Sequence, residues 1–233
     1  MNNVRTVSDT KRTFYSLHTR PINTIYRRVV EELMVEMHLL SVNVDFSYNP
    51  IYALGVVTTF DRFMQGYQPE RDKESIFQAI CKAVEQDPQR YRQDAERSQA
   101  LAKSLAASDL IAWLSQTHHS DRDPDLQSQL QAIANNSQFK YNRLFAIGLF
   151  SLLEQSDPDL VKDEKQRTDA IKTIADGLHL SEDKLNKDLE LYRSNLEKMS
   201  QALAVMADML LADRKKREQR QQTTSATPPT ANE

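Results

Sequence analysis

Only four glycines are spread over 233 residues, and this scarcity constrains the fold more than any other feature of the sequence. A sheet-rich chain of this length needs many tight turns, and tight turns favour Gly, Asn and Pro. Helices joined by short connections need few glycines. The composition therefore predicts an all-α fold and argues against a β-sandwich, a β-barrel or a dinucleotide-binding α/β fold.

The expected starts of helices share one local pattern. An Asn or Asp stands directly before a proline at four places: Asn49-Pro50, Asp87-Pro88, Asp123-Pro124 and Asp157-Pro158. Asn and Asp side chains cap the first turn of a helix, and proline suits the first helical position because its missing N–H would have no partner there. Between such breaks the apolar residues recur at helical spacing, as in Ile25, Val29, Leu33, Met37 and Leu40.

Two segments, 51–63 and 144–153, are apolar on nearly every side. Helices of this kind belong in the middle of a bundle. Each contains a glycine, Gly55 or Gly148, although glycine inside a helix costs about 1 kcal/mol relative to alanine. Close approach of a neighbouring helix is the expected reason. We therefore predict that both glycines are packing contacts at the centre of the bundle.

The pattern changes after Ser181, where apolar residues alternate four and three positions apart. This heptad seam comprises Leu185, Leu189, Tyr192, Leu196, Met199, Leu203, Met206 and Leu210, with no Gly or Pro between them. A seam of period 3.5 is typical of a coiled-coil helix. We predict a helical bundle domain over 1–179, a long C-terminal coiled-coil-type helix over 180–222 and a disordered tail over 223–233. The repeat leaves open whether this helix folds back, dimerises or projects.

Charge and cysteine content limit the classes of partner and compartment. The net charge of −3 and the pI near 6.0 provide no basic footprint for nucleic acid, so no nucleic-acid partner is expected. Cys81 is the single cysteine, which excludes an internal disulfide. The longest apolar runs are far shorter than the roughly 17 residues that a membrane-spanning helix needs. With no transit peptide in view, we expect a soluble or peripheral protein without a transmembrane helix.

A search for catalytic patterns gives one candidate, the group Glu32, Glu36 and His38 on one expected helix. Di-iron sites in helical bundles use Glu-x-x-His, which places both ligands on one face. Glu36 and His38 are two positions apart and therefore face different ways. We predict no catalytic residue, no cofactor and no metal site, and we expect the protein not to be an enzyme.

The end of the long helix is the strongest candidate for partner binding. The predicted contact residues are the outer part of the seam and the basic run that follows it: Leu196, Met199, Leu203, Met206, Leu210, Arg214, Lys215, Lys216 and Arg217. The mixture of Leu and Met indicates an adaptable surface. The basic run suits anionic lipid headgroups, but we favour a solvated helix end whose cations complement the helix dipole, because a single short cluster gives only marginal membrane affinity.

A set of short strings also occurs in a fixed order along nearly the whole chain. They include Thr6-Val-Ser-Asp-Thr-Lys11, Arg20-Pro-Ile22, Ala53-Leu-Gly55, Met64-Gln-Gly-Tyr67, Tyr91-Arg92, Gly148-Leu-Phe150 and Tyr192-Arg193. On this ordered set the chain resembles the thylakoid formation family, although each string alone is a weak signal. Because the family motif begins within ten residues of Met1, the resemblance is to a cyanobacterial member without a chloroplast transit peptide.

The resemblance implies an all-helical auxiliary or adaptor protein of photosystem II biogenesis and repair and of thylakoid membrane organisation. It implies FtsH-type membrane proteases, photosystem II assembly components or both as partners, and a place on the cytoplasmic side of the thylakoid membrane. It implies no catalytic residue and no cofactor. A peripheral membrane-binding module and a pigment or lipid carrier are the alternative functions, and the oligomeric state stays open.

Overall fold

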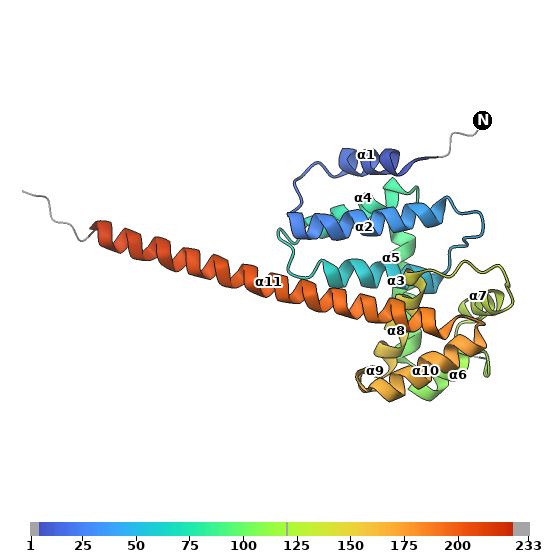
Figure 1. Cartoon of the computed structure of the whole chain (residues 1–233). Helices are drawn as coiled ribbons and strands as arrows, with labels where there is room; N and C mark the ends of the chain where they lie inside the picture. The colour runs from blue at the N-terminus through green and yellow to red at the C-terminus, as the bar shows by residue number, and fades with distance from the viewer. Residues whose placement is uncertain (1–4, 120, 226–233) are drawn as a thin grey trace, which may run out of the picture. The chain divides into compact units, whose positions relative to one another are not determined.

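The computed structural model describes residues 5–119 and 121–225, which form α-helices and contain no β-strand. The all-α fold class is thus confirmed (Figure 1). In chain order the helices are α1 (Val7–Leu17), α2 (Thr24–Ser41), α3 (Pro50–Phe63), α4 (Asp72–Ala83), α5 (Pro88–Lys103), α6 (Ala107–Leu114), α7 (Pro124–Ala134), α8 (Arg143–Ser156), α9 (Pro158–Lys162), α10 (Glu164–Gly177) and α11 (Glu182–Ser225).

The chain divides into two compact units, the first ending at Tyr192 and the second beginning at Arg193. The division falls inside α11, which is one continuous helix (Figure 1). α11 continues through residues 223–225, so the helix extends three residues into the segment predicted as a disordered tail. The first helix-breaking proline comes only at Pro228. The rest of that tail, 226–233, lies outside the described residues.

The capping pattern read from the sequence explains where four helices begin. α3, α5, α7 and α9 each start at the proline that follows Asn49, Asp87, Asp123 and Asp157. The Asn49 side-chain oxygen accepts from the Tyr52 N–H at 2.9 Å, and Asp123 accepts from the Leu126 N–H at 3.0 Å. Each cap satisfies a backbone donor that has no partner within the helix. The four predicted helix starts are confirmed.

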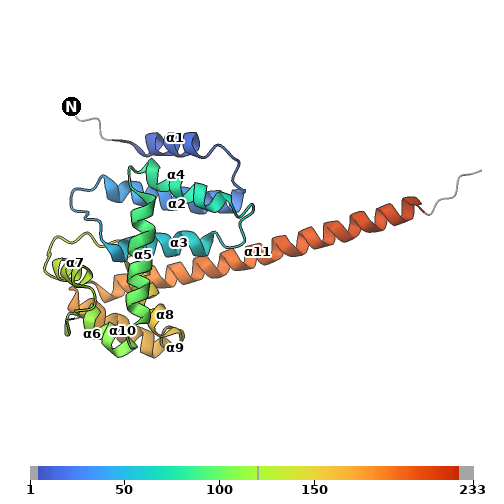
Figure 2. The same ribbon diagram turned by 180° about the vertical axis from the view of Figure 1, so that it is seen from behind.

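α3 is the central helix of the first unit. It packs most extensively on α8 and α5, while α1 lies on α4 and α2. In Figures 1 and 2, α1, α2 and α3 lie at successive levels and α5 runs across these levels. All residues of α3 from Pro50 to Phe60 are buried, as are those of α8 from Leu144 to Leu153. The two segments that are apolar on every side therefore form the core.

α3 and α8 touch backbone to backbone at their glycines. A Cβ atom built on Gly55 would lie 1.7 Å from the carbonyl oxygen of Leu144, and one built on Gly148 would lie 1.9 Å from the carbonyl oxygen of Ile51. No other residue type fits at this distance without moving a helix. The crossing leaves no space for a pigment or lipid between these two helices. It therefore argues against a carrier that holds its ligand between α3 and α8.

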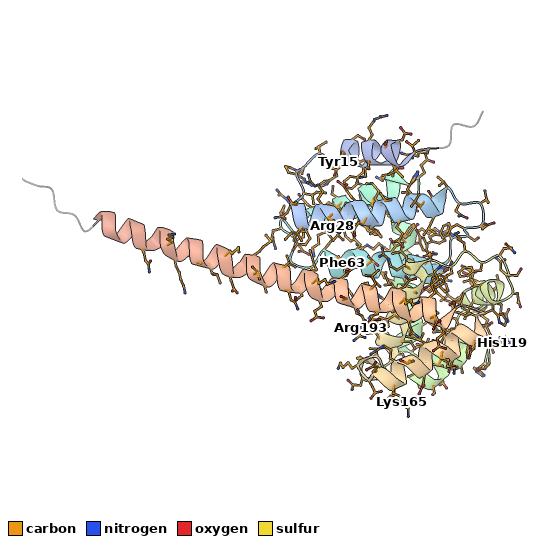
Figure 3. The ribbon with its side chains drawn as sticks, viewed as in Figure 1. Tyr15, Arg28, Phe63, His119, Lys165 and Arg193 are labelled. Carbon is orange, nitrogen blue, oxygen red and sulfur yellow. The ribbon has the colours of Figure 1, made fainter. Side chains whose placement is uncertain are left out.

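Polar contacts fasten α1 to its neighbours around the buried ring of Phe14. The Thr10 hydroxyl pairs with His38 Nδ1 of α2 at 2.9 Å, and His18 Nδ1 pairs with the Ser75 hydroxyl of α4 at 3.1 Å. Both histidines are buried. On the outer side Tyr15, labelled in Figure 3, donates its hydroxyl to Glu31 of α2 at 2.6 Å. α1 is therefore held by a small number of specific groups.

The glycine crossing predicts a large effect of a single methyl group. Gly148→Ala would place Cβ against the Ile51 carbonyl, and we expect the free energy of unfolding to fall by about 3 kcal/mol or more. Chemical denaturation followed by circular dichroism measures this. Gln155→Ala, at a partly exposed position of the same helix, is the matched control and should change stability little. An unchanged midpoint for Gly148→Ala would contradict the crossing.

The buried histidines predict a pH dependence of stability. Burial lowers the pKa of His18 and of His38, with Arg20 and Arg5 lowering them further and Asp72 and Asp9 opposing this. At these two positions the unfolded chain then binds more protons than the folded one. The stability that the two neutral histidines contribute is therefore fully present above about pH 6.5 and is lost as the pH falls below that value. We expect the free energy of unfolding to drop between ~pH 7.5 and ~pH 5.5. The drop should shrink in the His18→Gln/His38→Gln variant; an equal drop there would refute the assignment.

Candidate functional site

The first turns of α11 belong to the core of the first unit. Leu185, Leu189 and Tyr192, the first three seam positions, are buried. The Tyr141 hydroxyl donates to the Asp188 carboxylate at 2.8 Å, and the Lys184 ammonium lies 4.7 Å from the centre of the Tyr141 ring. The seam therefore begins as an ordinary buried helix face, with polar contacts beside it that fix its position.

Tyr192 is the last buried position of the seam. Its ring centre lies 5.9 Å from that of Phe63, which Figure 3 labels on α3. The ion pair of Arg62 with Glu154 links α3 and α8 nearby. Burial raises the pKa of Tyr192 to about 12. The Tyr192 phenol is therefore neutral at about pH 7. It is the last buried side chain of the seam and the last residue of the first unit.

Beyond Tyr192 the same repeat has a different environment. Leu196, Met199, Leu203 and Met206 are each partly exposed. Leu210 and Arg217 lie within α11, but their side chains are outside the described part of the structure. Arg214, Lys215 and Lys216 are exposed. Of the predicted contact residues, the structure thus places four on a partly exposed helix face and three in an exposed basic run at its end.

Further apolar side chains of this segment are more exposed than the seam itself. Val205, Met209 and Leu211 have 52%, 64% and 58% of their surface accessible. The sequence interpretation concentrated on the heptad repeat and missed them. The signal was present, because residues 202–212 contain one charged residue, Asp208, among alanines and larger apolar residues. The candidate functional site is therefore the segment 193–217, including but not limited to its seam.

The candidate catalytic group of α2 does not converge on a common point. Glu32 pairs with Arg28 of its own helix at 2.8 Å, Glu36 pairs with Arg143 at 2.5 Å, and His38 pairs with Thr10. Burial raises the pKa of Glu36, while Arg143 opposes the shift. Over residues 5–119 and 121–225, no three His, Cys, Asp or Glu side chains come together as a metal site would require.

Cys81 lies in the core, where its environment fits a packing role. Its side chain is buried, and the sequence contains no second cysteine with which it could form a disulfide. Burial raises the pKa of its thiol to about 12, so the thiol stays protonated near neutral pH. The reactive form of cysteine is the thiolate, so this side chain acts as a small apolar group.

Among the helices of the described residues, none combines the length and the apolar character that a bilayer span needs. α11 has the required length, but charged residues recur along it, including Glu197, Lys198 and Asp208.

Comparison with known proteins now identifies the chain. The family model described as thylakoid formation protein matches residues 6–221. The chain belongs to the thylakoid formation protein family. Protein Thf1 of Nostoc punctiforme is 80% identical over 235 residues, covering 100% of both chains. Protein Thf1 of Nostoc sp. is 83% identical over 225 residues, covering 97% of each. These relatives are cyanobacterial, as the resemblance indicated.

A solved structure shares the fold of this thylakoid formation protein. The structure of Psb29 at 1.55 Å has a TM-score of 0.79 and 44% sequence identity, and the match covers 92% of this chain and 99% of that one. At this identity the likeness reflects common descent as well as a common fold. The resemblance seen in the short strings is thus confirmed along the whole chain.

The change of environment along the seam predicts unequal effects of equal substitutions in this thylakoid formation protein. Leu189→Ala would open a cavity in the first unit and should lower the free energy of unfolding by about 3 kcal/mol. Leu203→Ala removes the same atoms from a partly exposed position, so we expect a loss below about 1 kcal/mol. Urea denaturation of both variants checks this. Equal losses would show that the seam has a single environment throughout.

Proposed function

We propose that this thylakoid formation protein is a non-enzymatic auxiliary factor of photosystem II biogenesis and repair and of thylakoid membrane organisation. It binds and stabilises an FtsH-type thylakoid protease, and photosystem II assembly components are its second class of partner. The binding surface is the outer seam, defined as Leu196, Met199, Leu203, Met206 and Leu210. The protein works on the cytoplasmic side of the thylakoid membrane.

Family membership supports the biological setting. The matching model is that of a thylakoid formation protein, and it covers 6–221. The likeness to Psb29 over 92% of the chain points to the same setting of thylakoid and photosystem II biogenesis. The protease is the finer part of the proposal, and it rests on the resemblance together with the form of α11.

The partly exposed seam is the observation that carries the proposed mode of binding. Four seam residues with described side chains present apolar atoms to solvent along three turns of helix: Leu196, Met199, Leu203 and Met206. Leucine and methionine at seam positions pack into the grooves of a partner helix, and methionine adapts to irregular surfaces. A surface of this kind suits a helical partner whose contact face is not strictly periodic.

The charged groups of the bundle support a scaffold role for the first unit. Many of its ion pairs link different helices, as Arg143 does with Glu36 and Arg92 does with Asp61 at 2.8 Å. Arg97 reaches both Asp123 and Asp125, at 3.0 and 2.7 Å. These side chains hold helices together, and partly exposed pairs of this type each contribute at most about 1 kcal/mol.

A pair of substitutions in the outer seam tests the proposal. Leu203→Gln/Met206→Gln keeps helix propensity but removes apolar contact, so we expect protease recovered with the tagged full-length protein from detergent-solubilised thylakoids to fall at least about ten-fold. Quantitative mass spectrometry of the pull-down measures this. Truncation from Ser181 is a poorer test, because it would also remove Leu185 and Leu189 from the core of the first unit.

Leu211→Gln is the matched control for this experiment. Leu211 is an exposed leucine of the same segment that stands outside the seam, so its replacement should leave protease recovery unchanged. Equal recovery with the seam variant and the wild type would reject the outer seam as the binding surface. Failure of the wild-type protein to retain the protease would reject the proposed partner itself.

A further inference from the structure

A second apolar stripe runs along α11 beside the outer seam. Its positions are again four and three apart, and it has a lysine at each end: Lys198, Ala202, Val205, Met209, Ala212 and Lys216. We call this set the lysine-flanked stripe. Each of its positions precedes a seam position by one residue, so it lies roughly 100° around the helix from the seam. The segment therefore has two apolar faces.

The lysine-flanked stripe is the more exposed of the two faces. Val205 and Met209 have 52% and 64% of their surface accessible, and Lys198, Ala212 and Lys216 are exposed as well. The seam residues at 199, 203 and 206 are only partly exposed. The stripe is thus the face whose burial against another surface would remove most apolar area from water.

The charges around the lysine-flanked stripe are mainly positive. Arg214 and Lys215 stand directly before Lys216 and are exposed. Lys and Arg outnumber Asp and Glu between residues 193 and 220, although the whole chain has a net charge of −3. Glu197 and Asp208 stand outside both apolar faces, and Asp213 continues the seam. The surface that complements the stripe is therefore apolar in the middle and anionic at its rim.

We propose that the lysine-flanked stripe docks on an anionic lipid bilayer, with α11 lying in the plane of the membrane surface. Val205 and Met209 enter the boundary between headgroups and acyl chains. Lys198 and Lys216 extend along that boundary and place their ammonium groups among the phosphates. This inference does not depend on the protease proposal, because it uses the other face of the helix.

The combination of two weak signals makes lipid the occupant that the observations favour. The binding of a surface helix to a membrane strengthens with the apolar area that it buries and with the attraction of its cations to anionic lipid, and the stripe supplies both. A helix of a protein partner would meet the two terminal lysines only if it had acidic residues at both ends of the contact. A bilayer surface supplies phosphates along its whole length, so no special register is needed.

Flotation of the full-length protein with lipid vesicles tests the inference. We expect the protein to float with vesicles of equal parts phosphatidylglycerol and phosphatidylcholine, and not with pure phosphatidylcholine. Each cation near an anionic surface contributes a factor of about five, so Lys198→Gln/Lys216→Gln should reduce binding about 30-fold. Val205→Ser/Met209→Ser should reduce it by about ten-fold or more through lost apolar burial.

Two matched variants separate this face from general charge and from the seam. Lys165→Gln/Lys172→Gln removes the same charge from exposed positions of α10 and should bind vesicles as the wild type does. The seam variant Leu203→Gln/Met206→Gln should also bind. The inference is wrong if the wild type stays unbound with anionic vesicles, if the α10 variant loses as much binding as the stripe variant, or if only the seam variant loses binding. The assay contains no protease, so its result stands apart from the pull-down.

Discussion

The backbone contact between α3 and α8 is the constraint on which the first unit depends. The Leu144 carbonyl oxygen would lie 1.7 Å from a Cβ on Gly55, so the two helices approach as closely as main chains can. α5 packs on both helices of that pair, α2 packs on α3, and α6 and α9 pack on α8. α1, α4 and α10 pack in turn on these helices. A bundle centred on a main-chain contact has little freedom to adjust, because backbone atoms cannot change rotamer to absorb a shift.

α11 is divided between the two units, and the environment of its seam residues changes at the division. Leu185, Leu189 and Tyr192 are buried, and the seam continues beyond them without a change of period. A repeat of period 3.5 specifies only that one face is apolar, and burial depends on what that face meets. Tyr192 is the last buried residue of the seam, and the next seam residues with described side chains are partly exposed. The same helix therefore contributes to the core over its first turns and presents partly or fully exposed apolar residues beyond them.

The sequence predicts the helix starts, the two core helices and the central glycines, because each depends on local chemistry or on a repeat that can be counted. Other features depend on residues distant along the chain. A Cβ on Gly177, the last residue of α10, would lie 2.1 Å from the carbonyl oxygen of Ser115, which is far away in the sequence. Equally, nothing near His38 indicates that Thr10 will lie against it. Such contacts are created by the fold, so they cannot be read from composition or spacing.

In residues 193–217 the local sequence contains a second regular signal besides the heptad repeat. The heptad repeat drew attention to Leu203 and Met206, while Val205 and Met209 form an equally regular stripe one residue earlier. Two stripes about 100° apart let one helix contact two surfaces at once. The proposed protease contact and the proposed bilayer contact would then use different faces of one helix. The lysine-flanked stripe would orient α11 on the lipid so that the seam faces along the membrane, toward whatever protein stands beside it.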